Sequence, residues 1–157
     1  ALLVGAVPGA IPPLMGWTAA TGSIDLPGLL LFFILFLWQI PHFLAISLVH
    51  LKEYEEAGIR VLPLEKGIGA AKNWMVRYLA GLTAVSLYPV LLGFADSRYL
   101  WTAAGLGLLF LSLGIYGLRE TAGRRWARQF FLLSLLYLPS LLISFCVSAN
   151  FGNLIPN

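Results

Sequence analysis

The sequence contains one cysteine, two methionines and two histidines among 157 residues, and only 11% of its residues are charged. A single cysteine, Cys146, excludes an internal disulfide and a cysteine-based zinc site. Charge is too scarce for a soluble globular domain, in which about a quarter of the residues are charged. Apolar residues are abundant instead: 59% of the chain is hydrophobic. The sequence therefore predicts an integral membrane protein.

Five apolar runs are long enough to cross the hydrocarbon core of a bilayer, which takes about 20 residues in a helix. None of them contains Asp, Glu, Lys or Arg. Strands of a membrane barrel alternate in polarity, whereas these runs are apolar on every face. We therefore predict an all-α fold with a single membrane domain over residues 1–157. The predicted spans are Ala1–Ala20, Leu26–Val49, Tyr78–Ala95, Leu100–Leu118 and Phe130–Ala149.

Basic residues are distributed unevenly between the connections of these spans. Nine of the ten Lys and Arg residues lie in segments 50–77 and 119–129, and only Arg98 lies in a turn on the other side. Because Lys and Arg concentrate in cytoplasmic loops, both segments are predicted to face the cytoplasm. The net charge of +3 follows from this topology, so it does not predict binding to nucleic acid.

Helix-breaking and small residues mark two of the spans. The first span contains Pro8, Pro12 and Pro13. Broken backbone at membrane depth is tolerated only where protein or a cavity covers it, so we expect this segment to face the bundle interior. It would do so either as a kinked packing helix or as part of a substrate-lining wall. In the fourth span, Gly105, Gly107 and Gly114 are expected to allow close packing of helices.

The second span ends in a concentration of polar side chains. Gln39 and His42 are three residues apart and share one helical face, next to Trp38 and Pro41. Polar side chains inside a bilayer are costly, which makes them candidates for function. Two interpretations of His42 stay open. It contacts a ligand or reacting group, or it hydrogen-bonds a carbonyl that Pro41 leaves without a donor.

Beyond that span, Lys52, Glu53 and Glu56 are predicted to lie on a helix that leaves the membrane. The spacing projects Glu53 and Glu56 from one side of this helix. Carboxylates on one face can hold Mg²⁺ while basic neighbours bind phosphate oxygens. The alternative is a solvated charged face that binds nothing. Two carboxylates complete a Mg²⁺ site only if a substrate phosphate or other protein groups supply further ligands.

Three segments stand out as motifs: 9–17 (GAIPPLMGW), 38–43 (WQIPHF) and 52–63 (KEYEEAGIRVLP), with shorter matches at 66–67, 71–73 and 126–128. In this order they resemble the protoheme IX farnesyltransferases, or haem O synthases, of the UbiA prenyltransferase superfamily. The likeness covers essentially the whole chain but only the C-terminal half of the family's pattern. It implies the last five helices of a nine-helix bundle. We therefore expect an N-terminal part to precede Ala1 and to carry the family's first acidic motif.

The resemblance implies transfer of a farnesyl group from farnesyl diphosphate to the vinyl group of haem B, which gives haem O. It implies Mg²⁺ held at a second acidic motif, with Glu53 where the family more often has Asp, and with Lys52 and Tyr54 beside it. Arg60 stands where the family more often has proline. The predicted substrate-binding residues are Trp38, Gln39, His42, His50, Arg60, Lys66 and Lys72.

The resemblance further implies a location in the cell inner membrane and a contact with haem A synthase or with terminal oxidase assembly. Two other functions stay open. One is a UbiA-type prenyltransferase whose acceptor is an aromatic quinone precursor. The other is a non-enzymatic membrane protein, such as a transporter or an assembly subunit, in which proline-broken helices are also expected.

Overall fold

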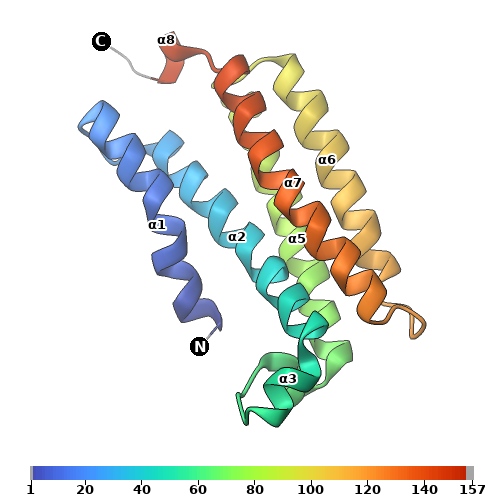
Figure 1. Ribbon diagram of the computed structural model, residues 1–157. Coiled ribbons are helices and arrows are strands. Elements are labelled where there is room, and N and C mark those ends of the chain that lie inside the picture. The colour runs from blue at the N-terminus through green and yellow to red at the C-terminus, as the bar shows by residue number, and fades with distance from the viewer. Residues whose placement is uncertain (1, 155–157) are drawn as a thin grey trace.

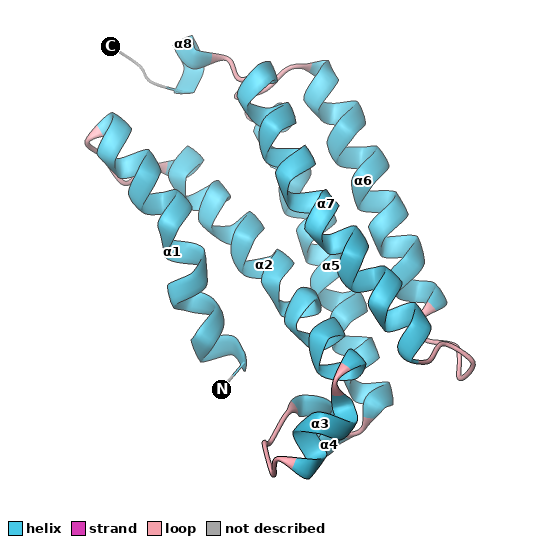
Figure 2. Cartoon of the chain, viewed as in Figure 1, coloured by secondary structure: helices cyan, strands magenta, loops and turns pink. Residues whose placement is uncertain are grey.

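The computed structural model describes residues 2–154, which form a bundle of helices (Figure 1). Five long helices run up and down in chain order, and three short ones lie at the ends. Within the described residues no β-strand occurs (Figure 2), and the five long helices are each long and apolar enough to cross a membrane. The all-α prediction is confirmed. The helices are α1 (Leu2–Thr21), α2 (Leu26–Val49), α3 (Leu51–Glu56), α4 (Leu62–Lys66), α5 (Ile68–Leu91), α6 (Ser97–Tyr116), α7 (Arg124–Ser148) and α8 (Phe151–Leu154).

Four of the long helices close into a ring of contacts: α2 packs on α5, α5 on α6, α6 on α7, and α7 again on α2. Aromatic rings fill the space between them. The ring centroid of Phe110 lies 4.6 Å from that of Phe130 and 5.1 Å from that of Tyr137. All three side chains are almost fully buried. Lipid offers no hydrophobic drive for helix association, so this close packing is what holds the four-helix bundle together.

Helix α1 lies outside the four-helix bundle and packs on α2 (Figure 1). Ala6 and Ala10 are fully buried in the fold, whereas Val4 is 75% exposed and Met15 64% exposed. The expected break in the backbone is not found, because α1 continues as a helix through its three prolines. Each proline removes only its own N–H from the ladder, and small residues let α2 approach closely. The predicted start of this span, Ala1, lies outside the described residues.

Two of the three glycines of α6 lie at close helix contacts. A Cβ atom at Gly107 would stand 2.8 Å from Thr83, and one at Gly114 would stand 2.5 Å from Leu79. These two positions confirm the expected close packing of α6 on α5. The expectation is wrong for Gly105, around which there is open space. Gly105 is two residues from Gly107, so it turns away from the helix that Gly107 contacts.

The observed helices extend beyond the charge-free runs. The predicted span Leu26–Val49 coincides with α2, whose N-cap Asp25 accepts a hydrogen bond from the backbone N–H of Gly28. In contrast, α5 begins at Ile68, ten residues before the predicted start, and α7 begins at Arg124, six residues before it. Freedom from charge marks the hydrocarbon core and not the helix end, so helices continue into the interface with their Lys and Arg residues.

Candidate functional site

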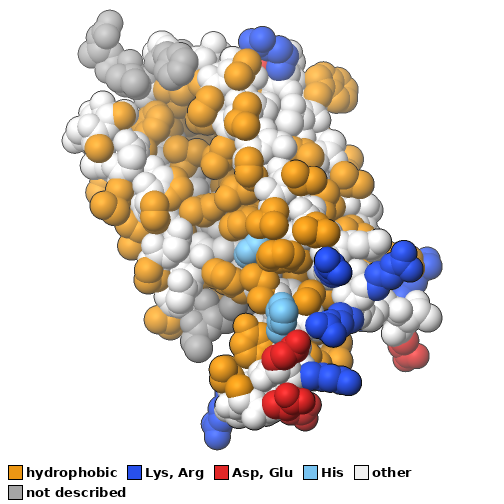
Figure 3. Space-filling model, viewed as in Figure 1, with side chains coloured by type: hydrophobic (Ala, Val, Ile, Leu, Met, Phe, Trp, Pro, Cys, Tyr) orange, Lys and Arg blue, Asp and Glu red, His pale blue; other side chains and the backbone are white. Residues whose placement is uncertain are grey.

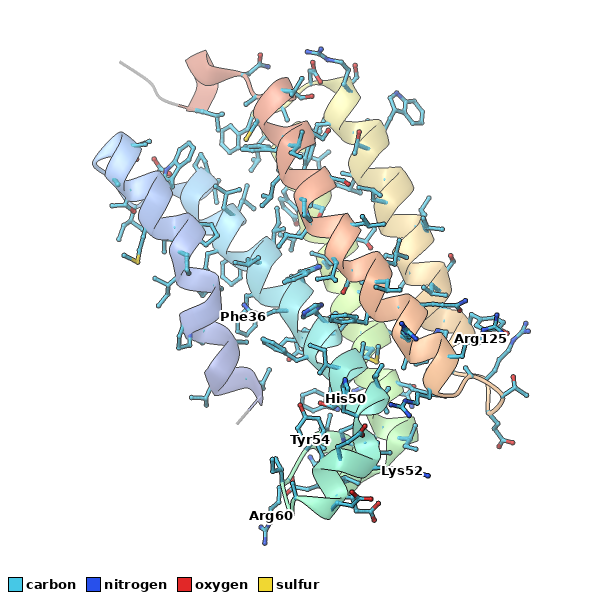
Figure 4. The ribbon with its side chains drawn as sticks, viewed as in Figure 1. Phe36, His50, Lys52, Tyr54, Arg60 and Arg125 are labelled. Atoms are coloured by element: carbon cyan, nitrogen blue, oxygen red, sulfur yellow. The ribbon has the colours of Figure 1, made fainter. Side chains whose placement is uncertain are left out.

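Charged side chains gather at one end of the bundle, where α2 and α5 meet the start of α7. Figure 3 shows Lys and Arg side chains there, beside a histidine and acidic groups. His50, Lys52 and Tyr54 come from the end of α2 and from α3, and Arg125 comes from the first turn of α7 (Figure 4). The chain turns back between α4 and α5 at Gly67, whose φ of 88° suits glycine. The residues after α2 and the start of α7, which are about 70 residues apart in the sequence, meet at this end of the bundle.

The carboxylate of Glu53 stands between the side chains of His50 and Arg124. Its Oε1 atom is 3.5 Å from Nδ1 of His50 and 3.5 Å from Nη2 of Arg124. A hydrogen bond from its own backbone N–H, together with the charges of Arg124 and His50, lowers the pKa of Glu53 below its ordinary value, against a smaller opposing effect of desolvation. Glu53 is therefore an anion at neutral pH, available to a metal ion or a cationic partner.

A cavity of about 450 Å³ opens beside Glu53, and we call it the mixed-charge cavity. Its polar lining carries both signs of charge, from Lys52, Glu53, Lys72, Glu120 and Arg124. Its remaining walls are mostly apolar. The complete lining is Leu48, Val49, Leu51, Lys52, Glu53, Ile68, Lys72, Glu120, Ala122, Gly123, Arg124, Trp126 and Ala127. Such a lining can hold a metal ion on its carboxylates and an anion on its cations.

Lys72 shapes this cavity by holding the turn between α6 and α7. Its ammonium group donates hydrogen bonds to the carbonyl oxygens of Ala122 at 2.7 Å and Arg119 at 3.2 Å. It also lies 5.3 Å from the ring centroid of Trp126, whose indole N–H donates to the carbonyl of Leu113. The side chain that the sequence predicts as a substrate ligand thus has a structural role that the sequence did not indicate.

We expect Lys72→Met to lower the free energy of unfolding by about 1.5–3 kcal/mol, because two carbonyl oxygens lose a charged donor while the aliphatic stem remains. Denaturation of the purified protein in detergent measures this change. Lys66→Met is the matched control, since Lys66 is exposed and its ammonium group lies 5.9 Å from the ring of Trp74. Equal stability of the two variants would contradict the structural role of Lys72.

His42 lies deeper in the four-helix bundle, where its ring is stacked on Trp38 with centroids 4.6 Å apart. Its Nδ1 atom is 2.7 Å from the hydroxyl of Ser134, which itself donates to the carbonyl of Phe131. The single hydroxyl hydrogen of Ser134 serves either Nδ1 or the carbonyl of Phe131, and in both cases the contact fixes the orientation of the His42 ring. The partner of Nδ1 is therefore a hydroxyl on α7 and not a carbonyl freed by Pro41.

Gln39 and His42 point to different neighbours of α2. The side-chain amide of Gln39 donates to the carbonyl oxygen of Ala6 on α1 at 2.9 Å, whereas His42 pairs with α7. Gly9 lies against the same amide, where no Cβ atom would fit. The two side chains lie three residues apart on α2 and bond to different neighbouring helices. Gln39 instead ties α1 to the four-helix bundle.

Four other predicted residues do not line the mixed-charge cavity. Tyr54 and Glu56 lie on α3 outside it, Arg60 lines a separate hollow at the α3–α4 turn, and Lys66 stands near Trp74. Their predicted roles, including Glu56 as a second metal ligand, stay predictions. Of the predicted site residues, those that meet at the mixed-charge cavity or at its rim are His50, Lys52, Glu53 and Lys72.

The residues present fit a Mg²⁺ ion that is bound mainly through a phosphate group. Mg²⁺ commonly takes one or two protein carboxylates and completes its shell with phosphate oxygens and water. Glu53 and Glu120 provide carboxylates in the lining of the mixed-charge cavity. No group of three His, Cys, Asp or Glu side chains converges within residues 2–154, so a closed all-protein site is not found there.

The sequence alone does not mark the arginines at the start of α7 as site residues. Arg124 pairs with Glu53, and Arg124, Arg125 and Arg128 line a second cavity beside His50. The signal that could have found them is the spacing of three arginines within five residues, directly before an apolar span. In the sequence, that spacing indicates only the membrane topology, because nothing there shows which loops meet.

Comparison with known proteins gives a match to the model of the UbiA prenyltransferase family over residues 1–136. A protoheme IX farnesyltransferase of Sorangium cellulosum is 54% identical over 148 residues, which cover 94% of this chain and 53% of the relative. One of Myxococcus xanthus is 50% identical over 90% of this chain and 48% of its own length. One of Alkalihalophilus pseudofirmus is 45% identical over 90% of this chain and 44% of its own length.

The chain thus spans about half the length of the curated relatives it matches. No solved structure matches it.

Proposed function

Since the chain belongs to the UbiA prenyltransferase family, we propose that the complete protein transfers a farnesyl group from farnesyl diphosphate to the vinyl group of haem B and forms haem O. The relatives that carry this activity in their names support the proposal. The observation that carries it in the structure is the placement of Glu53, an ionised carboxylate among cations, at a cavity on the polar end of an apolar bundle.

The diphosphate of the donor would bind in the mixed-charge cavity. Lys52 and Arg124 line it and would take phosphate oxygens, and Glu53 would hold Mg²⁺. When bound, Mg²⁺ would supply positive charge that neutralises the leaving diphosphate. Breaking the bond between the farnesyl carbon and the diphosphate oxygen leaves an allylic cation. The apolar wall, which includes Leu48 and Trp126, would keep water away from that cation until the acceptor attacks.

In the acceptor half of the reaction, the terminal vinyl carbon of haem B forms a bond to the farnesyl carbon. Water then adds to the resulting benzylic-type cation and loses a proton, which gives the hydroxyethylfarnesyl side chain. His50 at the polar end and His42 with Trp38 deeper in the four-helix bundle are the proposed haem contacts, because they present aromatic rings beside apolar walls. The contact with haem A synthase or oxidase assembly stays a prediction.

Binding of haem B by the purified complete protein tests this proposal against an aromatic acceptor. We expect haem B to give a saturable change in the Soret absorption and 4-hydroxybenzoate, a quinone precursor, to leave that titration unchanged. Displacement of haem by the aromatic acid, or prenylation of the acid, would favour the quinone-type prenyltransferase. Failure of the protein to bind either compound would favour a non-enzymatic membrane protein.

The orientation we propose places the basic end of the bundle in the cytoplasm and the protein in the inner membrane, because nine of ten Lys and Arg residues lie in segments 50–77 and 119–129. A Cys146→Ser background that carries Glu65→Cys should resist a membrane-impermeant maleimide in intact spheroplasts and react after permeabilisation. Ser23→Cys, in the exposed turn after α1, is the matched control that should react from outside. The reverse pattern would overturn the orientation.

A further inference from the structure

A second cavity, distinct from the mixed-charge cavity, lies between the end of α2 and the start of α7. Its volume is about 880 Å³, and we call it the arginine groove. The polar residues that line it are His50, Arg124, Arg125 and Arg128. No acidic residue lines it. The arginine groove therefore differs from the mixed-charge cavity in carrying positive charge alone.

Two of these arginines are available to a ligand. Arg124 is paired with Glu53, whereas Arg125 and Arg128 make no ion pair or side-chain hydrogen bond within residues 2–154. They are three residues apart at the start of α7, so they lie on one face about 4.5 Å apart along the helix. Guanidinium groups bind carboxylates through two parallel hydrogen bonds, and two such groups suit a ligand with two carboxylates.

The rest of the arginine groove is apolar. Ile46 and Val49 of α2 and Phe131 and Leu132 of α7 form it. The ring of Phe131 lies 5.1 Å from that of His42, so the apolar wall continues into the four-helix bundle. A ligand that fits has anionic groups at the polar end and an apolar body that extends along α2 and α7. The flat ring of Phe131 on this wall favours a planar body.

We propose that Arg125 and Arg128 bind the two carboxylates of haem B and so anchor the acceptor substrate. This inference rests on the proposed function and deepens it. A diphosphate that binds through Mg²⁺ suits the mixed-charge cavity, where carboxylates can coordinate the ion. The two carboxylates of haem B need no bridging metal ion, only hydrogen-bond donors such as guanidinium groups. Arg124 lines both cavities, so donor and acceptor would bind next to each other. Fixing the carboxylate edge of haem sets which vinyl group can face the donor.

The test uses the complete protein in lipid nanodiscs and titrates haem B and its dimethyl ester, in which both carboxylates are blocked. We expect Arg125→Gln and Arg128→Gln each to weaken haem B binding by about tenfold. Neither change should affect the ester, which already lacks the bound groups. Farnesyl diphosphate affinity should stay within about twofold of the wild type. Arg119→Gln is the matched control. This substitution removes the same charge from the nearby α6–α7 turn, and Arg119 does not line the arginine groove.

Each other outcome overturns the inference in a recognisable way. Equal affinity for haem B and its ester in the wild type would show that the carboxylates are not bound. Loss of farnesyl diphosphate affinity in the two variants would place the diphosphate in the arginine groove. An effect seen only in nanodiscs with phosphatidylglycerol, and not in pure phosphatidylcholine, would assign the arginines to an anionic lipid. A wild type that binds no haem would instead refute the proposed function itself.

Discussion

Glu53→Gln should reduce farnesyl transfer by about a hundredfold or more, because the amide keeps the size of the side chain but loses the charge that would hold Mg²⁺. Glu53→Asp should retain most activity, since a carboxylate remains. The ionised state of Glu53 at neutral pH follows from its lowered pKa, so the glutamine variant changes the charge of the mixed-charge cavity at assay pH. Turnover of the complete enzyme is measured at several Mg²⁺ concentrations.

Glu55→Gln is the matched control for this change. Glu55 is exposed on the same short helix and lines the hollow at the α3–α4 turn instead of the mixed-charge cavity. Its loss removes one negative charge at a similar distance from the membrane, and we expect less than a twofold change in turnover. If Glu53→Gln kept full activity at limiting Mg²⁺, Glu53 would not be a metal ligand.

His42→Ala should weaken haem binding and slow farnesyl transfer by about tenfold or more, while farnesyl diphosphate affinity changes little. The substitution removes the ring stacked on Trp38 and its Nε2 atom, and His42 does not line the mixed-charge cavity. Stability should fall as well, by about 1–3 kcal/mol, because Ser134 loses a buried partner. Haem titration and thermal unfolding on the same preparation separate these two effects.

Ser86→Ala provides the control for the stability part of the effect. Ser86 is fully buried in α5, and its hydroxyl lies 3.3 Å from that of Tyr137, one turn of α7 beyond the Ser134 that pairs with His42. We expect a similar loss of stability and an unchanged haem affinity. A His42→Ala protein that loses stability but binds haem as tightly as the wild type would return His42 to a purely structural role.

The fold could be predicted from the sequence because the membrane imposes a strong and local rule. A run of about 20 uncharged apolar residues leaves few alternatives to a spanning helix, and all five predicted spans correspond to long helices. What failed was the position of helix ends such as Ile68, since polar interface residues can continue a helix. The unbroken course of α1 was not predicted either, because prolines alone do not decide whether a helix continues.

The site was only partly predictable because half of it comes from distant residues. Glu53 and its neighbours on α3 form a visible motif in the sequence. Arg124 reaches Glu53 only through the closure of α7 on α2, and the hydroxyl of Ser134 reaches His42 in the same way. Lys72 shows a contact that the sequence does not indicate, because this charged residue beside a motif binds two backbone carbonyls. Local patterns indicate chemistry, whereas helix packing decides which groups meet.

The most direct test of the proposed reaction is mass spectrometry of the porphyrin after incubation of the purified complete protein with haem B, farnesyl diphosphate and Mg²⁺. We predict a product heavier than haem B by one farnesyl group and one hydroxyl group. It should form in amounts equal to the diphosphate released and should disappear with Glu53→Gln. Recovery of unchanged haem B, while the same preparation prenylates an aromatic acid, would contradict haem as the acceptor.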